Sequence, residues 1–337
     1  MFDSFLRHLK VVYSSSQLFR RISQIYFSSP FHKLIVSLTV SWKTQQPTRY
    51  NLIIETVNSC NASCLMCPYR EMNRARLVMD DATFDKIINR LQTEKLPINK
   101  VFFSGMGEPL LDRKILDRVA QVQNLGLRVK LYTNASLLTK EVSDRIVELG
   151  VSEMNISFNG ANKEGYEKVM KLDYKKANQN IKYLLRARKG KTTPIVRISS
   201  ILTKENENKT KSHLSRWNKI VDSVGVSIAH EWGGSVYSTA IKSTFEKNHV
   251  FPCRSLWHTL NIDSKGNFVI CCRDYESKTK LGNIYTHSFK DIIKHPTIEK
   301  FKSLHLKQDI RELPAICRGC NFPFQEGVEW FMPRSSD

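Results

Sequence analysis

Three cysteines within eight residues are the part of this sequence best suited to chemistry: Cys60, Cys64 and Cys67 have the spacing C-x3-C-x2-C. Three thiolates on one tight loop can ligate three irons of a cubane iron–sulfur cluster and leave the fourth iron without a protein ligand. Such an open position can bind a substrate or cofactor, as the open position of catalytic zinc does. A zinc site would need a fourth ligand here, and the upstream histidines, His8 and His32, are distant in sequence.

A second group of cysteines lies near the end of the sequence. Its members with metal-ligand spacing are Cys253, Cys271, Cys317 and Cys320. Four thiolates close a cubane cluster completely, although the same spacing also fits a structural zinc ribbon. Cys272 is left over. It could replace Cys271 as a ligand, be a small buried residue, or donate a hydrogen atom to a substrate radical.

Buried strands alternate with helical stretches around the first motif. Strands are expected at 51–57, 100–104, 128–133, 151–158, 195–202 and 224–229, with helices at 81–93 and 113–125 among those between them. This rhythm predicts parallel βα units, and hence an α/β fold with a partial (β/α)6 TIM-like barrel. In such folds the chemistry lies at the carboxyl ends of the strands, and the cysteine motif follows the first strand.

The rhythm changes beyond about residue 235, and the sequence divides into three predicted parts. Residues 1–48 form a basic helical extension, 49–235 the partial barrel, and 236–337 a small cysteine-rich α+β domain for an iron–sulfur group. Apolar residues recur near helical spacing at the start of the extension. We expect this helix to dock on the body of the protein, with peripheral membrane contact as the alternative.

Composition limits the function classes. Fifty-two Lys and Arg against 32 Asp and Glu give a net charge of +20, which predicts an anionic partner such as nucleic acid, a membrane surface, or a phosphorylated or carboxylated substrate. A 41% apolar share supports a folded core, and no apolar run is long enough to cross a bilayer. Cysteines grouped for metal, without a secretory signal, predict a cytoplasmic protein.

The first motif and the Gly105–Pro109 segment (GMGEP) resemble the radical S-adenosylmethionine (radical SAM) superfamily, over about residues 52–229. The resemblance implies that the three cysteines hold a [4Fe–4S] cluster and that SAM is cleaved reductively to a 5′-deoxyadenosyl radical. It implies that Gly107 and Glu108 hold the methionine amino group of SAM. Asn134 and Ser157 match positions on the ribose and carboxylate side, with an ordinary strand-end cap as the alternative for each.

Two positions depart from the common pattern of that superfamily. Many relatives have an aromatic residue just before the third cysteine, against the adenine. This chain has Met66 there and Tyr69 two positions beyond Cys67. Many relatives also have an arginine where this chain has Met170.

The second cysteine group resembles the SPASM/Twitch extensions of radical SAM enzymes, which house auxiliary [4Fe–4S] clusters. The resemblance implies that Cys253, Cys271, Cys317 and Cys320 ligate one auxiliary cluster. The fuller pattern has further cysteines after the C-x2-C pair, and residues 321–337 contain none. Such a cluster would accept the electron left on a substrate radical.

The first expectation for function is hydrogen abstraction from a small polar substrate, such as a sugar, aminocyclitol or nucleotide-sugar, for oxidation or epimerisation. The alternatives are a maturase of a ribosomally made peptide or protein, an RNA-modifying enzyme, and a non-catalytic cluster-binding interaction protein. A flavodoxin or ferredoxin would donate electrons, and nucleic acid is not the expected partner. The sequence does not rank Glu108, Arg197, His230 and Glu231 as catalytic acid or base.

Overall fold

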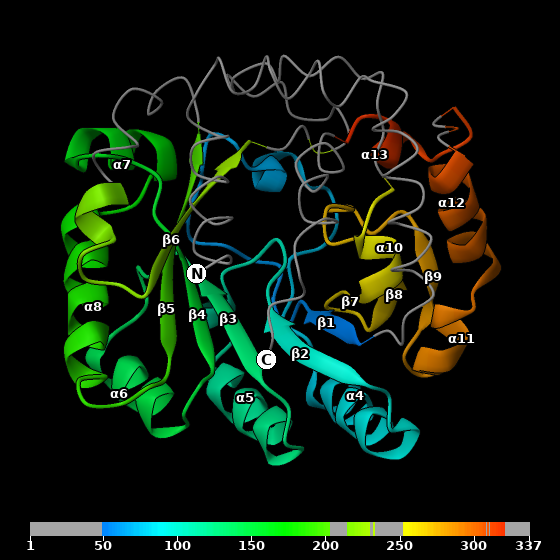
Figure 1. Cartoon of the computed structure of the whole chain (residues 1–337), viewed down its shortest axis with the longest axis horizontal. Helices are drawn as coiled ribbons and strands as arrows, with labels where there is room; N and C mark the ends of the chain where they lie inside the picture. Colours follow the sequence, from blue (N-terminus) through cyan, green and yellow to red (C-terminus); the bar gives the residue numbers. More distant parts are fainter. Residues whose placement is uncertain are drawn as a thin grey trace, which may run out of the picture.

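A computed structural model describes residues 49–202, 214–229, 232, 252–307, 309 and 311–320. The barrel strands are β1 (Tyr50–Ile54), β2 (Ile98–Phe103), β3 (Val129–Thr133), β4 (Glu153–Ser157), β5 (Ile195–Leu202) and β6 (Ser223–Ile228). Each pairs in parallel with the next, and together they curve into a partial barrel (Figure 1). The structure therefore confirms the predicted α/β partial barrel.

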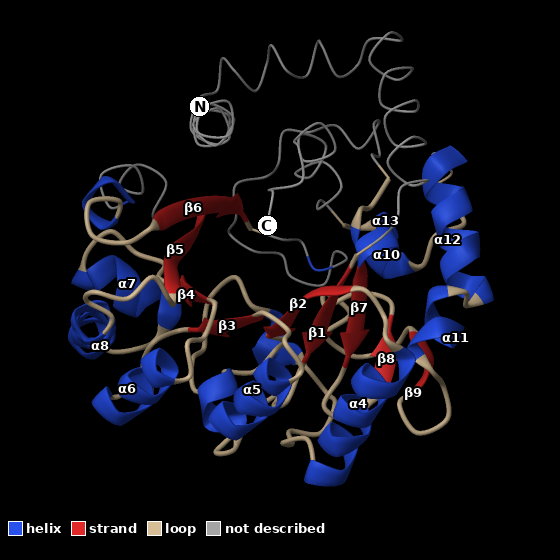
Figure 2. Cartoon of the chain, turned by 60° about the horizontal axis from the view of Figure 1, so that its bottom comes forward, coloured by secondary structure: helices blue, strands red, loops and turns tan. Residues whose placement is uncertain are grey.

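Helices cover the outer face of these strands (Figure 2). They are α4 (Asp81–Glu94), α5 (Ile115–Asn124), α6 (Lys140–Glu148), α7 (Lys163–Met170) and α8 (Tyr174–Ala187). Every second strand residue belongs to the buried core, such as Val129 and Leu131 in β3, while Lys130 and Tyr132 project to the opposite, inner face. Period-two burial thus fixes which side chains enter the barrel.

The C-terminal part of the chain is joined to the barrel through the sheet. It contains α10 (Ser255–His258), β7 (Thr259–Ile262), β8 (Asn267–Val269), β9 (Lys280–Asn283), α11 (Phe289–Ile293), α12 (Pro296–Lys307) and α13 (Ala315–Arg318). Strand β7 pairs in parallel with β1, and β8 and β9 follow antiparallel, so the sheet order is β6-β5-β4-β3-β2-β1-β7-β8-β9. The sequence predicted a small additional domain, and the structure shows that its strands extend the barrel sheet.

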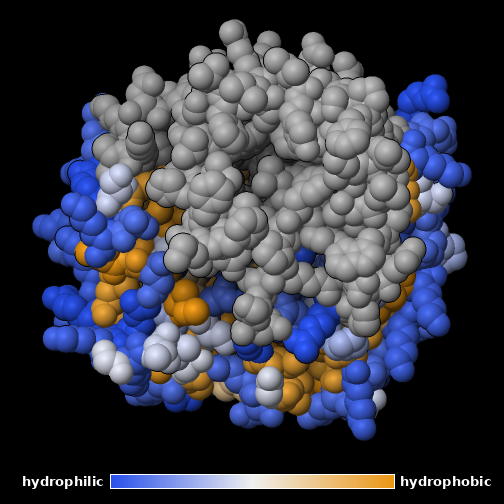
Figure 3. All heavy atoms as spheres, viewed as in Figure 1, coloured by the Kyte–Doolittle hydropathy of each residue, from blue (hydrophilic) through white to orange (hydrophobic). Residues whose placement is uncertain are grey.

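The first predicted strand is longer than the one observed. β1 ends at Ile54, and Val57 instead forms an isolated antiparallel bridge with Val78. Hydrophilic side chains cover most of the helical rim among the described residues (Figure 3). No helix in the described part of the chain is long and apolar enough to cross a bilayer. The predicted extension at 1–48 lies outside the described residues, and the domain boundaries stay predictions.

Candidate active site

The first cysteine motif lies on the loop after β1 and is anchored to the end of α7. The backbone N–H groups of Ser63 and Leu65 donate to the carbonyl oxygens of Met170 and Val169, at 3.3 and 3.0 Å. The last carbonyls of a helix have no partner within that helix, so this loop satisfies them. On its other side the loop meets Gly107, where an added Cβ would lie 2.1 Å from the Val57 carbonyl oxygen. Gly107 is therefore needed for the close approach of the two loops.

The three thiols of this loop form no disulfide and are each partly exposed. Burial raises the pKa of Cys60 to about 12 and also raises the pKa values of Cys64 and Cys67. Negative charge on Cys67 would raise the pKa of the other two further, so the three sulfurs lie near one another. Because metal binding displaces the thiol protons, three converging thiols fit the ligand set of an iron–sulfur cluster.

Glu108 joins the GMGEP loop to the end of β3. Its Oε1 accepts from the Thr133 hydroxyl at 2.7 Å, and its Oε2 accepts from the backbone N–H of Asn134 at 2.7 Å. The side chain is buried, and burial raises the pKa of the carboxyl to about 7. In this structure Glu108 braces two loops, and its contact with the amino group of SAM stays a prediction.

Asn134 lies beside the cysteine loop in a hydrogen-bonded triangle. Its Nδ2 donates to Asn61 Oδ1 at 3.0 Å, Asn61 donates to the Ser136 hydroxyl, and that hydroxyl donates back to Asn134 Oδ1. A hydrogen bond from Asn134 also lowers the pKa of Cys60, although burial dominates that pKa. The structure thus brings predicted Asn134 to the cysteines. The sequence analysis missed Asn61 and Ser136, whose only signal was their place inside the CNASC and TNAS segments.

Met66 and Tyr69, the two residues predicted for the adenine side, have different surroundings. The Met66 side chain is buried in a small apolar cluster with Val169 and Ala229. Tyr69 lies on the short helix η1 (Pro68–Glu71), where the Arg76 guanidinium stacks 4.4 Å from its ring centroid. Both are on the cysteine loop or next to it, and their contacts with SAM stay predictions.

Ser157 ends β4, and Met170 ends α7, the helix whose last carbonyl groups anchor the cysteine loop. Ser157 is the last residue of β4 and is partly buried, so it lies at the carboxyl edge of the sheet as expected. Met170, at the end of α7, places its sulfur 3.6 Å from the Cys64 sulfur. The position where many relatives carry an arginine is therefore filled here by a neutral thioether that touches Cys64.

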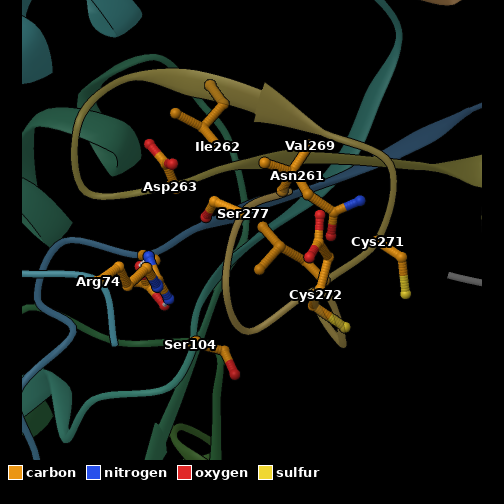
Figure 4. Close-up of a pocket in the computed structure, with 13 residues that line it drawn as sticks. Arg74, Ser104, Asn261, Ile262, Asp263, Val269, Cys271, Cys272 and Ser277 are labelled. Atoms are coloured by element: carbon orange, nitrogen blue, oxygen red, sulfur yellow. Dashed lines mark hydrogen bonds and ion pairs between the residues drawn. The ribbon is translucent and has the colours of Figure 1, made fainter. Parts of the chain in front are cut away.

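A pocket opens between the barrel mouth and the C-terminal part (Figure 4). Its lining includes Glu55, Arg74, Ser104, Asn261, Cys271 and Cys272. Glu55 follows β1 and forms a two-pronged ion pair with Arg74, at 2.6 and 2.7 Å. Arg74 also donates to the Tyr275 carbonyl oxygen at 2.6 Å, which ties the barrel to the loop after β8. Both cysteines of the Cys271–Cys272 pair thus face the same space as the carboxyl ends of β1 and β2.

The second cysteine group gathers around that loop. A hydrogen bond from Cys272 and the nearby charge of Arg273 lower the pKa of Cys271, whereas burial raises the pKa of Cys317. Cys317 lies near enough to Cys271 and Cys320 for their charges to act on it. No three His, Cys, Asp or Glu side chains in the described ranges are placed to hold a single metal ion. Four thiols are nevertheless the donor set of a closed cubane cluster.

Two family models match the chain. The model of the radical SAM superfamily covers residues 54–215, and that of the SPASM iron–sulfur cluster-binding domain covers residues 253–321. The chain is a radical SAM protein with a SPASM domain. Its cofactors are accordingly a [4Fe–4S] cluster and SAM in the first domain and auxiliary iron–sulfur binding in the second. The residues that fit these groups are the two cysteine sets described above.

Curated relatives of this radical SAM protein match it over part of their length. A tungsten-containing aldehyde ferredoxin oxidoreductase cofactor-modifying protein of Pyrococcus furiosus is 30% identical over 46% of this chain and 44% of its own. A PqqA peptide cyclase of Bradyrhizobium diazoefficiens is 27% identical over 32% of this chain and 28% of its own. The chain thus spans less than half the length of these relatives.

Solved structures share the fold at low identity. Streptococcus suis SuiB bound to precursor peptide SuiA has a TM-score of 0.62, with 16% identity, over 87% of this chain and 73% of its own. The structure of anSMEcpe with AdoMet and a peptide has a TM-score of 0.60, with 15% identity, over 81% of this chain and 89% of its own. BtrN with AdoMet and 2-DOIA has a TM-score of 0.57, with 18% identity, over 82% of this chain and 94% of its own. At these identities the likeness establishes the fold alone.

Proposed function

We propose that this radical SAM protein is an enzyme that modifies a ribosomally made peptide or protein by abstracting hydrogen from one of its residues. The proposal is supported by a PqqA peptide cyclase that matches its sequence and by two peptide-bound structures that share its fold. The small polar substrate expected from the sequence has less support, because BtrN, whose structure contains AdoMet and 2-DOIA, is similar in fold alone, whereas the peptide cyclase is similar in sequence.

The chain's own residues would divide the work between two sites. Cys60, Cys64 and Cys67 would hold the cluster that binds SAM, while the Glu108 brace keeps the loops around it in place. Reductive cleavage of bound SAM supplies a hydrogen-abstracting 5′-deoxyadenosyl radical, so the protein's task is to orient substrate and exclude water. A flavodoxin or ferredoxin would supply the electron for that cleavage.

The single structural observation that carries the redox part of the proposal is the shared pocket. Cys271 and Cys272 line the same space as Glu55 and Ser104 at the barrel mouth. An auxiliary cluster held by Cys253, Cys271, Cys317 and Cys320 would therefore lie beside the substrate. That placement suits an electron acceptor for a substrate radical, and hence a net two-electron oxidation of the peptide.

The experiment is anaerobic reconstitution with iron, sulfide, SAM and reductant. The substrates are synthetic peptides encoded by short open reading frames next to the gene, with a panel of sugars and aminocyclitols in parallel. We expect a mass change of a peptide together with formation of 5′-deoxyadenosine, and neither product with Cys60→Ala. Turnover of a sugar or aminocyclitol with no change in any peptide would refute the proposal.

A further inference from the structure

The inner face of the barrel carries a concentration of positive charge that the proposed chemistry does not use. Lys100 on β2, Lys130 on β3 and Arg197 on β5 all alternate with core residues and so project into the barrel. Glu153 on β4 lies between them, directly opposite Lys130 in the strand register. Three cations and one carboxylate leave this part of the wall with a net charge of +2.

Glu153 is fully engaged by the two lysines. It forms an ion pair with Lys100, and its Oε2 lies 3.1 Å from the Lys130 ammonium. Burial alone would raise the pKa of Glu153, but the hydrogen bond from Lys100 and the charge of Lys130 outweigh burial and lower it. The carboxylate is therefore ionised at neutral pH and compensates the charge of the two lysines. The guanidinium of Arg197, on the next strand, is not part of this ion-pair cluster.

Arg197 forms no ion pair with any residue of the described ranges. It lies across Gly225 on β6, where an added Cβ would fall 2.0 Å from its Nη2. Only a residue without a side chain leaves this space for the guanidinium. The local sequence of β6 therefore permits a cation to occupy the barrel wall.

Tyr132 on β3 completes the arrangement. Burial raises its pKa to about 12, and the charge of Arg197 offsets that effect only in part, so the phenol keeps its proton and can donate it in a hydrogen bond. The charges of Cys272 and Arg273 also act on Tyr132. Tyr132 thus lies near Arg197 on one side and near the loop that carries the auxiliary cysteines on the other.

We propose that Arg197, with Tyr132 and Lys130 beside it, forms a subsite for a carboxylate of the substrate, which is an acidic side chain or the C-terminus of a peptide. A planar guanidinium can accept a carboxylate through two parallel hydrogen bonds, and such charge-assisted pairs are the strong ones. The inference rests on the proposed peptide substrate for the identity of the molecule, but the subsite itself requires only a carboxylate. The methionine carboxylate of SAM has the same chemistry, so the test must separate the two sources.

The test uses the reconstituted holoenzyme with SAM, reductant and two perdeuterated probes, N-acetylglutamate α-amide and its neutral isostere N-acetylglutamine α-amide. Deuterium that appears in 5′-deoxyadenosine reports which probe reaches the radical. We expect about tenfold or more transfer from the carboxylate probe over the neutral one, as for the loss of one charge-assisted pair. Arg197→Gln should bring this ratio close to one, and Gly225→Ala should lower it by displacing the guanidinium.

The controls keep the outcome decisive. Arg145→Gln removes an arginine from the exposed face of α6 and should leave the ratio unchanged. Arg197→Lys keeps the positive charge without the planar guanidinium and should give an intermediate ratio. It replaces Arg197→Gln in the test if that variant fails to fold. The Kd for SAM should be the same in the parent and in Arg197→Gln. An unchanged probe ratio in Arg197→Gln, or a Kd for SAM weakened tenfold, would overturn the subsite.

A third probe separates the subsite from the proposed function. Perdeuterated glutarate carries the carboxylate without any peptide group. If glutarate transfers deuterium, N-acetylglutamate α-amide does not, and Arg197→Gln abolishes the glutarate signal, the subsite stands and the peptide substrate is wrong. If N-acetylglutamate and N-acetylglutamine α-amides transfer equally in the parent, a peptide substrate is retained and the subsite is wrong.

Discussion

Replacing Arg74 by methionine should destabilise the protein strongly, because it leaves a buried carboxylate without its partner. The side chains of Arg74 and Glu55 are 14% and 7% exposed, and two hydrogen bonds join them. Each charge-assisted bond contributes about 1.5–3 kcal/mol, and breaking a buried pair costs about 3–5 kcal/mol. We therefore expect Arg74→Met to lower the free energy of unfolding by about 4 kcal/mol.

The assay is urea-induced unfolding of anaerobically purified protein, followed by circular dichroism, and it includes a double-mutant cycle. Glu55→Gln combined with Arg74→Met removes both charges, so the double variant should recover a large part of the stability lost by Arg74→Met. Arg145→Met is the matched control, because its partner Glu148 is exposed and such pairs contribute about 1 kcal/mol or less.

Two results would refute this reasoning. A loss below about 1 kcal/mol for Arg74→Met, equal to that of the Arg145→Met control, would mean that the pair is solvated like a surface pair. A double variant less stable than Arg74→Met would mean that the charge of Glu55 is not the source of the cost. In either case burial of the Glu55 carboxylate would not explain the cost of losing Arg74.

Three further predictions concern the site. Gly107→Ala, whose Cβ would meet backbone atoms of the cysteine loop at 2.1 Å, should weaken SAM binding by about 100-fold in equilibrium dialysis, whereas Gly165→Ala, which meets only a side-chain oxygen at 3.0 Å, should not. Because burial raises the pKa of Glu108 from 4.5 to about 7, its stabilising contribution is present below pH 4.5 and is lost as the pH rises through 7. The urea midpoint should therefore fall by more between pH 5 and pH 8 in the parent than in Glu108→Gln. An equal fall in the two proteins would contradict this. Cys60→Ala should abolish SAM cleavage, while Cys317→Ala should still form 5′-deoxyadenosine but no product, which chromatography would resolve. Formation of 5′-deoxyadenosine by Cys60→Ala would disprove the assignment of the first site.

The local features of the fold were predictable because their signals are local. Buried strands with alternating helices specify βα units, and the observed helix α4 begins at the predicted Asp81, where the Asp80 carboxylate accepts from the Thr83 N–H. The cysteine motif is likewise contiguous, and the structure places its three thiols together at the end of β1. These parts of the candidate site need no knowledge of distant residues.

Contacts between distant segments had no signal in the sequence. The four-residue strand β7 resembles one arm of a local hairpin, yet it also pairs with β1, which is about 200 residues away. Met170 touches Cys64 across 106 residues, and Arg74 reaches Tyr275 across 201. Polar residues in a loop, such as Arg74, look like solvent-facing residues until their partner is known. His230 and Glu231 lie outside the described residues.

The parallel pairing of β7 with β1 has a mechanical consequence for electron transfer. Backbone hydrogen bonds of one uninterrupted sheet connect the loop carrying the first thiol set with the loop carrying Cys271. The two redox groups would therefore be held by one rigid sheet and not by separate domains that can move apart. A strand register, rather than a hinge, would therefore set the distance between the radical site and the proposed electron acceptor.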